Sequence, residues 1–369
     1  MNIVAIAGSS IPSDTANSIQ VMKACSALVE LGHSLTLIVP EFAGRPQIDI
    51  QRHYGIPCPF PIEWLPSPSR RLFPILAFGR ALRHRPELIY TWFPFSAALG
   101  LLARTPVVLE AHFYPTGRFG PLWHWAFVHL PGQKRLVCIT QALLDILERD
   151  FGTHLRPEEI VIAPNGVELE RFASLPNPEQ ARRALGLPSA PTVVCAGHLY
   201  PGRGADLFLE LAKSLPEVQF VWVGGRPADV QEWTRRATGI QNIAFLGFVP
   251  NHELPRYLAA ADVLLMPYGR VILGSSGSLS SAAVASPMKM FEYMAAGRPI
   301  LSSDLPVIRE VLDETMAVFA PPEDVSAWRS ALIELLSDPQ RRARLAANAR
   351  RVIERYTWSA RARAILAGW

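Results

Sequence analysis

The stretch that decides the fold is Ser286–Glu310, SPMKMFEYMAAGRPILSSDLPVIRE. Its pattern predicts a helix that starts at a proline, then a short buried strand, then a second helix. Ser286 can cap the first helix, and Pro287 suits its first turn, where a missing N–H costs nothing. A near-continuous apolar strand between two helices is typical of a parallel sheet covered on both faces. The stretch therefore predicts an α/β fold.

The start of this helix is also a predicted binding site. Free N–H groups at a helix N-terminus attract an anion, and Ser286, Met288 and Lys289 lie there. Glu292 follows Lys289 by three residues, so both lie on one helix face. Phosphates on the amides and ribose hydroxyls on the carboxylate would suit a nucleotide-sugar. The alternatives are a surface lysine, which the helix dipole disfavours, and a solvent-facing carboxylate, which the apolar neighbours of Glu292 disfavour.

Outward from this stretch, apolar strands alternate with helical patterns. Asn2–Gly8, Ala16–Leu31 and Ser34–Val39 form a β-α-β unit, and a second series of this kind begins after Asn165. The 369 residues are too many for one ordinary core. We therefore expect two doubly wound Rossmann-like domains, with the cleft between their strand ends as the default site.

Composition narrows the class of protein. A hydrophobic content of 49% and a charged content of 18% indicate a packed globular chain. The net charge of +4 fits anionic ligands or lipid headgroups and is too weak to indicate nucleic acid. The four cysteines lack metal spacing, and three of them lie in apolar segments, which predicts buried free thiols and a reducing cytoplasm. The start, MNIVAIAGSS, indicates a strand, and no apolar run reaches the roughly 18–20 residues of a membrane-spanning helix.

Four motifs together resemble one known family. They are the Ser286 helix with RPILSSDLPVIREVL, GHLYPGRG at Gly197–Gly204, APNGVELERF at Ala163–Phe172, and FLGFVPNHELPRYLAAADVLLMPY at Phe245–Tyr268. As a set they resemble the retaining glycosyltransferases of family four. The resemblance implies the GT-B fold, with two Rossmann-like domains facing a central cleft. We expect an acceptor-binding domain at 1–168, a nucleotide-sugar-binding domain at 169–354, and a C-terminal helix at about 355–369 that crosses back to the first.

The resemblance also implies residue roles in the second half of the chain. Arg203, Lys289 and Glu292 would act in donor binding and catalysis, and Gly204 belongs to the same glycine-bearing loop as Arg203. His198 stands where the family has arginine, and either contacts the diphosphate or makes only a local backbone hydrogen bond. The backbone of Phe248 and Val249 matches a loop that contacts the nucleobase without selecting it.

The resemblance implies further roles in the first half of the chain and one departure in the second. His112 follows an apolar strand, and the family has a histidine near this point that contacts the donor sugar, with the leaving phosphate as a further contact. A packed loop histidine is the alternative. Glu110 lies nearby and could orient His112 or pair with a base. Gly8 allows a tight turn after the first strand, and we expect it to belong to the donor-binding residues. Val284 takes the place of a family glutamate, which puts the contact with the donor sugar in doubt.

The implied reaction is transfer with retention and without a metal or cofactor. Arg203, Lys289 and the helix amides would stabilise the departing diphosphate, with His198 as an optional further donor. A nucleotide-sugar epimerase of the same fold and a non-catalytic nucleotide-sugar-binding protein stay open as alternatives.

Two basic and apolar segments suggest a further partner. Residues 67–85 and 117–135 mix arginines with leucines and aromatic residues, which is the composition of an interfacial membrane surface. The equal alternative is that these residues form the core and rim of the first domain. If they dock on an anionic membrane, the acceptor is lipid-linked, as in cell-surface polysaccharide or glycolipid synthesis. The expected location is then the cytoplasm, at the inner face of the membrane.

Overall fold

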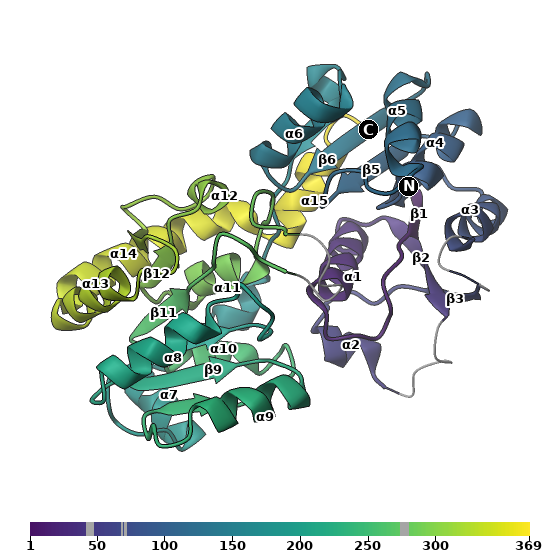
Figure 1. Ribbon diagram of the computed structural model, residues 1–369. Coiled ribbons are helices and arrows are strands. Elements are labelled where there is room, and N and C mark those ends of the chain that lie inside the picture. The colour runs from purple at the N-terminus through teal and green to yellow at the C-terminus, as the bar shows by residue number, and fades with distance from the viewer. Residues whose placement is uncertain (42–47, 68, 70–71, 274–279) are drawn as a thin grey trace. The chain divides into compact units, whose positions relative to one another are not determined.

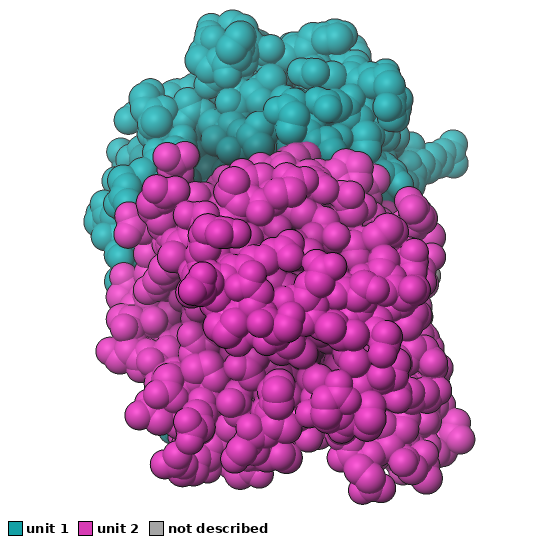
Figure 2. Space-filling view, turned by 90° about the vertical axis from the view of Figure 1, so that its left-hand side faces the viewer, with its two compact units in different colours: residues 1–165, 358–369 teal, residues 166–357 magenta. Residues whose placement is uncertain are grey.

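Apolar strands that are buried along most of their length form two parallel sheets (Figure 1). The computed structural model describes residues 1–41, 48–67, 69, 72–273 and 280–369. By internal contacts the chain separates into two units, which Figure 2 colours separately. Unit 1 holds residues 1–165 with 358–369, and unit 2 holds residues 166–357. Both are Rossmann-like, as the sequence predicts.

Unit 1 is built on a seven-stranded sheet in the order β3-β2-β1-β4-β5-β6-β7. Its strands are Asn2–Ile6 (β1), Ser34–Glu41 (β2), Ile62–Pro66 (β3), Leu88–Thr91 (β4), Val107–Ala111 (β5), Lys134–Cys138 (β6) and Ile160–Ile162 (β7). Its helices are Ala16–Glu30 (α1), Ile50–Tyr54 (α2), Phe73–Arg83 (α3), Pro94–Leu102 (α4), Gly120–His129 (α5), Gln141–Phe151 (α6) and Trp358–Leu366 (α15).

The order of strands in this sheet reverses at one point. The chain runs from β1 outward to β3, then returns to β4 on the other side of β1. Because such crossovers are right-handed, the reversal places α1 on one face of the sheet and α4 and α5 on the other. The C-terminal helix α15 packs beside α1, as the sequence predicts. The carboxyl ends of β1 and β4 therefore border the usual ligand crevice of such a sheet.

Unit 2 repeats this design with six strands in the order β10-β9-β8-β11-β12-β13. They are Thr192–Ala196 (β8), Gln219–Val223 (β9), Ile243–Phe245 (β10), Val263–Met266 (β11), Ile300–Ser303 (β12) and Ala317–Ala320 (β13). The helices are Pro178–Leu185 (α7), Ala205–Ser214 (α8), Pro227–Arg236 (α9), Leu254–Ala259 (α10), Met288–Ala296 (α11), Pro306–Arg309 (α12), Val325–Ser337 (α13) and Pro339–Val352 (α14). Here the reversal lies between β8 and β11.

Two edge strands, β3 and β13, go beyond what the sequence pattern predicts. β3 contains a glutamate and a proline, and β13 is only four residues long, so neither gives a strong strand pattern. The expected buried free thiols are present, since Cys25, Cys138 and Cys195 are buried and form no disulfide. Within the described ranges, no helix is both long and apolar enough to cross a membrane.

Candidate functional site

In unit 2, the loops after β8 and β11 meet at the reversal of strand order. Gly204 caps α8 in the left-handed conformation, with φ of +87°. A Cβ atom at this position would lie 1.9 Å from the carbonyl oxygen of Pro267. Only glycine allows both this backbone conformation and this close approach. The contact brings Arg203, which precedes Gly204, toward the residue that follows Pro267.

That residue is Tyr268, and two cations converge on it. Arg203 Nη1 donates a hydrogen bond to the Tyr268 hydroxyl at 3.1 Å, and its guanidinium carbon lies 5.2 Å from the centre of the ring. Lys289 Nζ lies 4.8 Å from the same ring centre. Among the described residues, neither cation has a carboxylate within ion-pair distance, and the buried Nε of Arg203 has no hydrogen-bond partner. The cluster is therefore suited to an anionic ligand.

Lys289 is buried, and its surroundings are mostly apolar. Its Nζ lies 3.9 Å from Cys195 Sγ and 5.9 Å from the centre of the Trp222 ring. The helix that holds it is fixed to β8, because the Tyr293 hydroxyl accepts a 2.7 Å hydrogen bond from the backbone N–H of Ala196. A buried ammonium group without a carboxylate is costly, and a bound anion would offset that cost.

Glu292 lies on the same helix but contacts a different group. Its Oε1 is 3.7 Å from Nη1 of Arg171, and both side chains are only 13% exposed. Arg171 also pairs with Glu168 at 3.2 Å and donates to the backbone oxygen of Asn251. The alternative of a solvent-facing carboxylate does not fit this burial, while the expected contact with ribose stays a prediction.

The helix α11 begins later than the sequence pattern predicts. Pro287 occupies the N-cap position with extended backbone, and its own side chain makes no capping hydrogen bond. The expected N-cap position is off by one residue, because the first helical residue is Met288 and Pro287, not Ser286, stands directly before it. Ser286 is buried and Met288 half-buried. The amides at this helix start remain a place for an anion.

Three other predicted residues lie on neighbouring loops of unit 2. His198 follows β8, and its ring stacks on Tyr200 with the ring centres 4.8 Å apart. Phe248 and Val249 follow β10, and Phe248 is 45% exposed. Their loop is joined to the end of β9, since Gly224 N–H donates to Gly247 at 2.7 Å. Val284, in the place of a family glutamate, is fully buried.

In unit 1, the predicted residues lie after β1 and β5. Gly8 is exposed and packs against the chain after β4, because a Cβ there would come within 2.6 Å of the Phe93 ring. Ser9 donates to Asn17, which ties the loop after β1 to the start of α1. His112 follows β5, and its side chain is 25% exposed. The ring is thus partly accessible, and its contact with the donor sugar stays a prediction.

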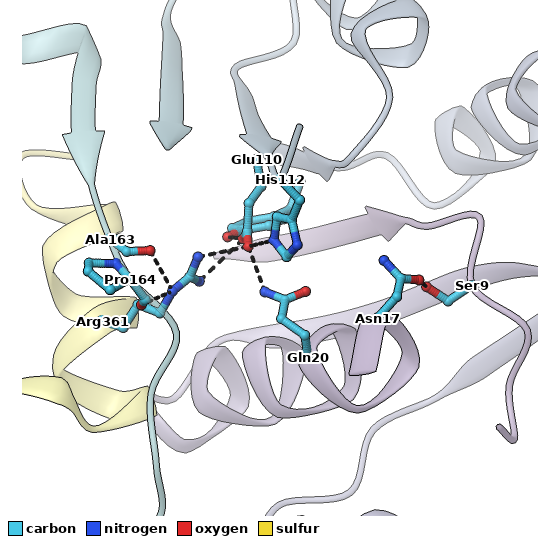
Figure 3. Close-up of polar contacts among 9 residues, drawn as sticks. Ser9, Asn17, Gln20, Glu110, His112, Ala163, Pro164 and Arg361 are labelled. Atoms are coloured by element: carbon cyan, nitrogen blue, oxygen red, sulfur yellow. Dashed lines mark hydrogen bonds and ion pairs between the residues drawn. The ribbon is translucent and has the colours of Figure 1, made fainter. Parts of the chain in front are cut away.

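His112 is held by a buried carboxylate (Figure 3). Its Nε2 lies 2.6 Å from Oε1 of Glu110, which is itself bound by both terminal nitrogens of Arg361. Burial alone would raise the pKa of Glu110, but the Arg361 charge and the hydrogen bond from His112 hold it well below its usual range. Because an ionised carboxylate only accepts hydrogen bonds, Nε2 of His112 carries the proton.

The helices α3 and α5 expose part of the segments predicted to dock on a membrane. Phe73 and Phe127 are buried in the unit, whereas Leu82 on α3 and Trp125 on α5 are exposed. Other exposed apolar residues here are Leu72, Ile75, Leu76, Phe119 and Leu122. Residues 68, 70 and 71 of the first segment lie outside the described residues. Each segment therefore supplies both core residues and exposed apolar ones, and docking on a membrane stays a prediction.

Four residues of these sites were not predicted from the sequence. Tyr268 lies at the end of a recognised motif, but only its ring contacts reveal a role. Arg171 also lies within a motif, and its partner Glu292 is far along the chain. Tyr293 and Arg361 give no signal beyond their positions in helices. In each case the partner is distant in sequence, so periodicity cannot identify it.

Comparison with known proteins connects these sites to a family. A model described as Glycosyl transferases group 1 matches residues 190–338, and one described as Glycosyltransferase Family 4 matches residues 18–171. The first model therefore covers most of unit 2 and the second most of unit 1, and together they cover most of the chain.

Individual relatives agree with these models. A GDP-mannose-dependent monoacylated alpha-(1-6)-phosphatidylinositol monomannoside mannosyltransferase from Corynebacterium glutamicum is 28% identical over 76% of this chain and 76% of its own length. A D-inositol 3-phosphate glycosyltransferase from Xylanimonas cellulosilytica is 33% identical over 64% of this chain and 58% of its own length. The crystal structure of Anabaena HepE in complex with UDP and glucose superposes with a TM-score of 0.73 at 18% identity, covering 100% of both chains, which shows a shared fold.

Proposed function

The chain belongs to the group 1 glycosyltransferases of family 4, and we propose that it moves a sugar from a nucleotide-diphosphate-sugar to a hydroxyl acceptor with retention. The observation that carries the proposal is the convergence of Arg203 and Lys289 on Tyr268. Two cations without carboxylate partners among the described residues match the charge of a diphosphate. Glu292, on the same helix as Lys289, then binds the ribose hydroxyls.

The proposed reaction needs no metal. As the bond to the anomeric carbon breaks, negative charge grows on the diphosphate, and Arg203, Lys289 and the amides at the start of α11 stabilise it. The acceptor hydroxyl attacks from the same face, and the departing phosphate takes its proton. His112 contacts the sugar, and the backbone of Phe248 and Val249 contacts the base. His198 adjoins the diphosphate, and Gly8 adjoins the diphosphate and the acceptor.

A panel of nucleotide-sugars in a thermal-shift assay would identify the donor. GDP-mannose and UDP-glucose are the first to test, because a relative from Corynebacterium glutamicum uses the former and HepE has been solved with the latter. Release of free sugar without an acceptor would then distinguish an enzyme from an inert nucleotide-sugar-binding protein.

Substitutions define the site more sharply. Arg203→Ala and Glu292→Ala should each lower nucleotide affinity by at least tenfold, since each removes a charged hydrogen-bonding group worth about 1.5–3 kcal/mol. Matched controls are Arg235→Ala and Glu232→Ala, which break an exposed ion pair on α9 in the same unit. Isothermal calorimetry with GDP or UDP would measure the affinities. Unchanged binding in both site variants would remove this site.

We further propose that unit 1 docks on anionic lipid at the cytoplasmic face of a membrane, where a lipid-linked acceptor would be available. Exposed apolar residues on α3 and α5 are accompanied by the exposed arginines Arg83, Arg85, Arg104 and Arg118. Apolar groups that enter the headgroup layer and cations that attract anionic lipids act together in interfacial binding.

Flotation with vesicles that contain anionic phospholipid would test the docking. Exchange of Leu122 and Trp125 for glutamine should reduce the bound fraction strongly, whereas Ile333→Gln, an exposed apolar residue of unit 2, should not. Absence of wild-type binding at low salt would refute the proposal.

A further inference from the structure

The carboxylate of Glu110 is the centre of a buried cluster in unit 1. It accepts hydrogen bonds from Gln20 of α1 at 2.6 Å, from Tyr90 of β4, from His112 at 2.6 Å, and from Arg361 of α15 at 2.7 and 3.2 Å. Glu110 and Tyr90 are only 1% exposed and Arg361 6% exposed. Four elements therefore supply donors to one ionised group, which leaves it little freedom to move.

This cluster determines which atom of His112 can face a ligand. Because Nε2 donates to Glu110, the lone pair of the imidazole tautomer that fits this contact lies on Nδ1. Figure 3 shows that the second ring nitrogen points away from Glu110. A lone pair repels a phosphate oxygen and accepts a hydrogen bond from a hydroxyl group. Of the two contacts suggested for this histidine, the geometry favours the sugar over the leaving phosphate.

Arg361 fixes the cluster from the C-terminal end of the chain. Its Nε donates to the backbone oxygens of Ala163 and Pro164, at 3.2 and 2.9 Å, while its two terminal nitrogens hold Glu110. The Arg361 guanidinium therefore connects α15 to the residues that follow β7 and to the carboxylate that binds His112. Without it, Glu110 would be a buried charge with no cation, and its hold on the imidazole would weaken.

We propose that Glu110 and Arg361 are positioning residues for sugar transfer. Arg361 holds the Glu110 carboxylate, which in turn keeps His112 protonated on Nε2 and presents Nδ1 to a hydroxyl group of the bound sugar. The C-terminal helix is then part of the reaction site. The inference rests on the proposed function, and it assigns an orienting role to two residues outside the donor-binding motifs.

Kinetic variants test the positioning role. Removing an outer residue that orients a reacting group typically lowers activity by about 10–100-fold. We expect this loss in the kcat of donor hydrolysis for Glu110→Gln, with nucleotide affinity unchanged within about twofold, because the predicted nucleotide site lies in unit 2. Arg361→Lys should retain more activity than Arg361→Met. Arg363→Met is the matched control, since Arg363 is exposed on the same helix and should keep full activity.

A double variant separates positioning from folding. Arg361→Met combined with Glu110→Gln removes both charges, so no unpaired buried charge remains and the unit should fold. We expect a melting temperature near that of the wild type and a kcat that is still reduced at least tenfold. A stable double variant with wild-type kcat would overturn the inference.

Nitrogen-15 NMR of the imidazole gives a readout that does not depend on activity. The wild type should show His112 as the Nε2–H form, and the double variant should lose that preference. Detection of the Nδ1–H form in the wild type would overturn the inference. If the wild type instead bound no nucleotide-sugar and released no sugar, the proposed function would fail, while the NMR result would still decide the orientation.

Discussion

Adding a single methyl group at Gly204 tests the close contact on which the unit 2 site depends. Gly204→Ala would place a Cβ 1.9 Å from the carbonyl oxygen of Pro267 and 2.6 Å from Cγ of its ring. The obstacle is backbone, so no rotamer change can relieve it. Gly186→Ala is the matched control, because Gly186 is also left-handed, with φ of +67°, lies in the same unit, and has no atom within 4 Å of the added Cβ.

The two substitutions share one free-energy cost and differ in another. A non-glycine residue in the left-handed region costs roughly 1–2 kcal/mol at either position. Gly204→Ala adds the cost of overpacking, about 1–3 kcal/mol. We therefore expect losses in the free energy of unfolding of about 1–2 kcal/mol for Gly186→Ala and about 2–5 kcal/mol for Gly204→Ala.

Urea unfolding of the full chain would measure both variants, compared within the transition of unit 2. The difference should also appear in binding. If the loop after β8 moves away from Pro267, Arg203 leaves Tyr268, and the affinity for GDP or UDP should fall at least tenfold. Gly186→Ala should bind normally. Equal destabilisation by the two substitutions, or normal binding by Gly204→Ala, would refute the reasoning.

Three further perturbations test other parts of the molecule. Burial lowers the pKa of His124 from 6.5 to about 4. Because protonation below pH 6.5 then favours the unfolded chain, the free energy of unfolding should fall by about 3 kcal/mol as the pH drops from 6.5 to 4. Urea unfolding should show a smaller decrease over this pH range in His124→Gln. Lys289→Met should weaken nucleotide binding about tenfold without lowering the melting temperature, because methionine suits the apolar surroundings; destabilisation with normal binding would contradict this. Arg171→Met should weaken binding of GDP or UDP severalfold through Glu292 and leave pyrophosphate binding unchanged, as paired calorimetric titrations would reveal.

Much of the fold can be predicted from the sequence, because strand burial and helix periodicity are local patterns. Apolar runs such as Thr192–Ala196 indicate central parallel strands, and the structure places β8 there with the same bounds. The alternation of strands and helices then implies a doubly wound sheet, whose ligand crevice lies at the reversal of strand order. Local chemistry also indicates Lys289 and Glu292 as binding residues.

Only the tertiary structure decides which of these groups act together. Lys289 and Glu292 share a helix face by spacing, yet Lys289 turns to Cys195 and Tyr268 while Glu292 pairs with Arg171. Their partners come from other strands and loops, so the choice depends on how the sheet is closed. The same holds for Glu110 and Arg361, which are 251 residues apart. Sequence determines the types of residues and the local elements, whereas packing determines which charges are neutralised, because electrostatic energy depends on distance in space and on burial.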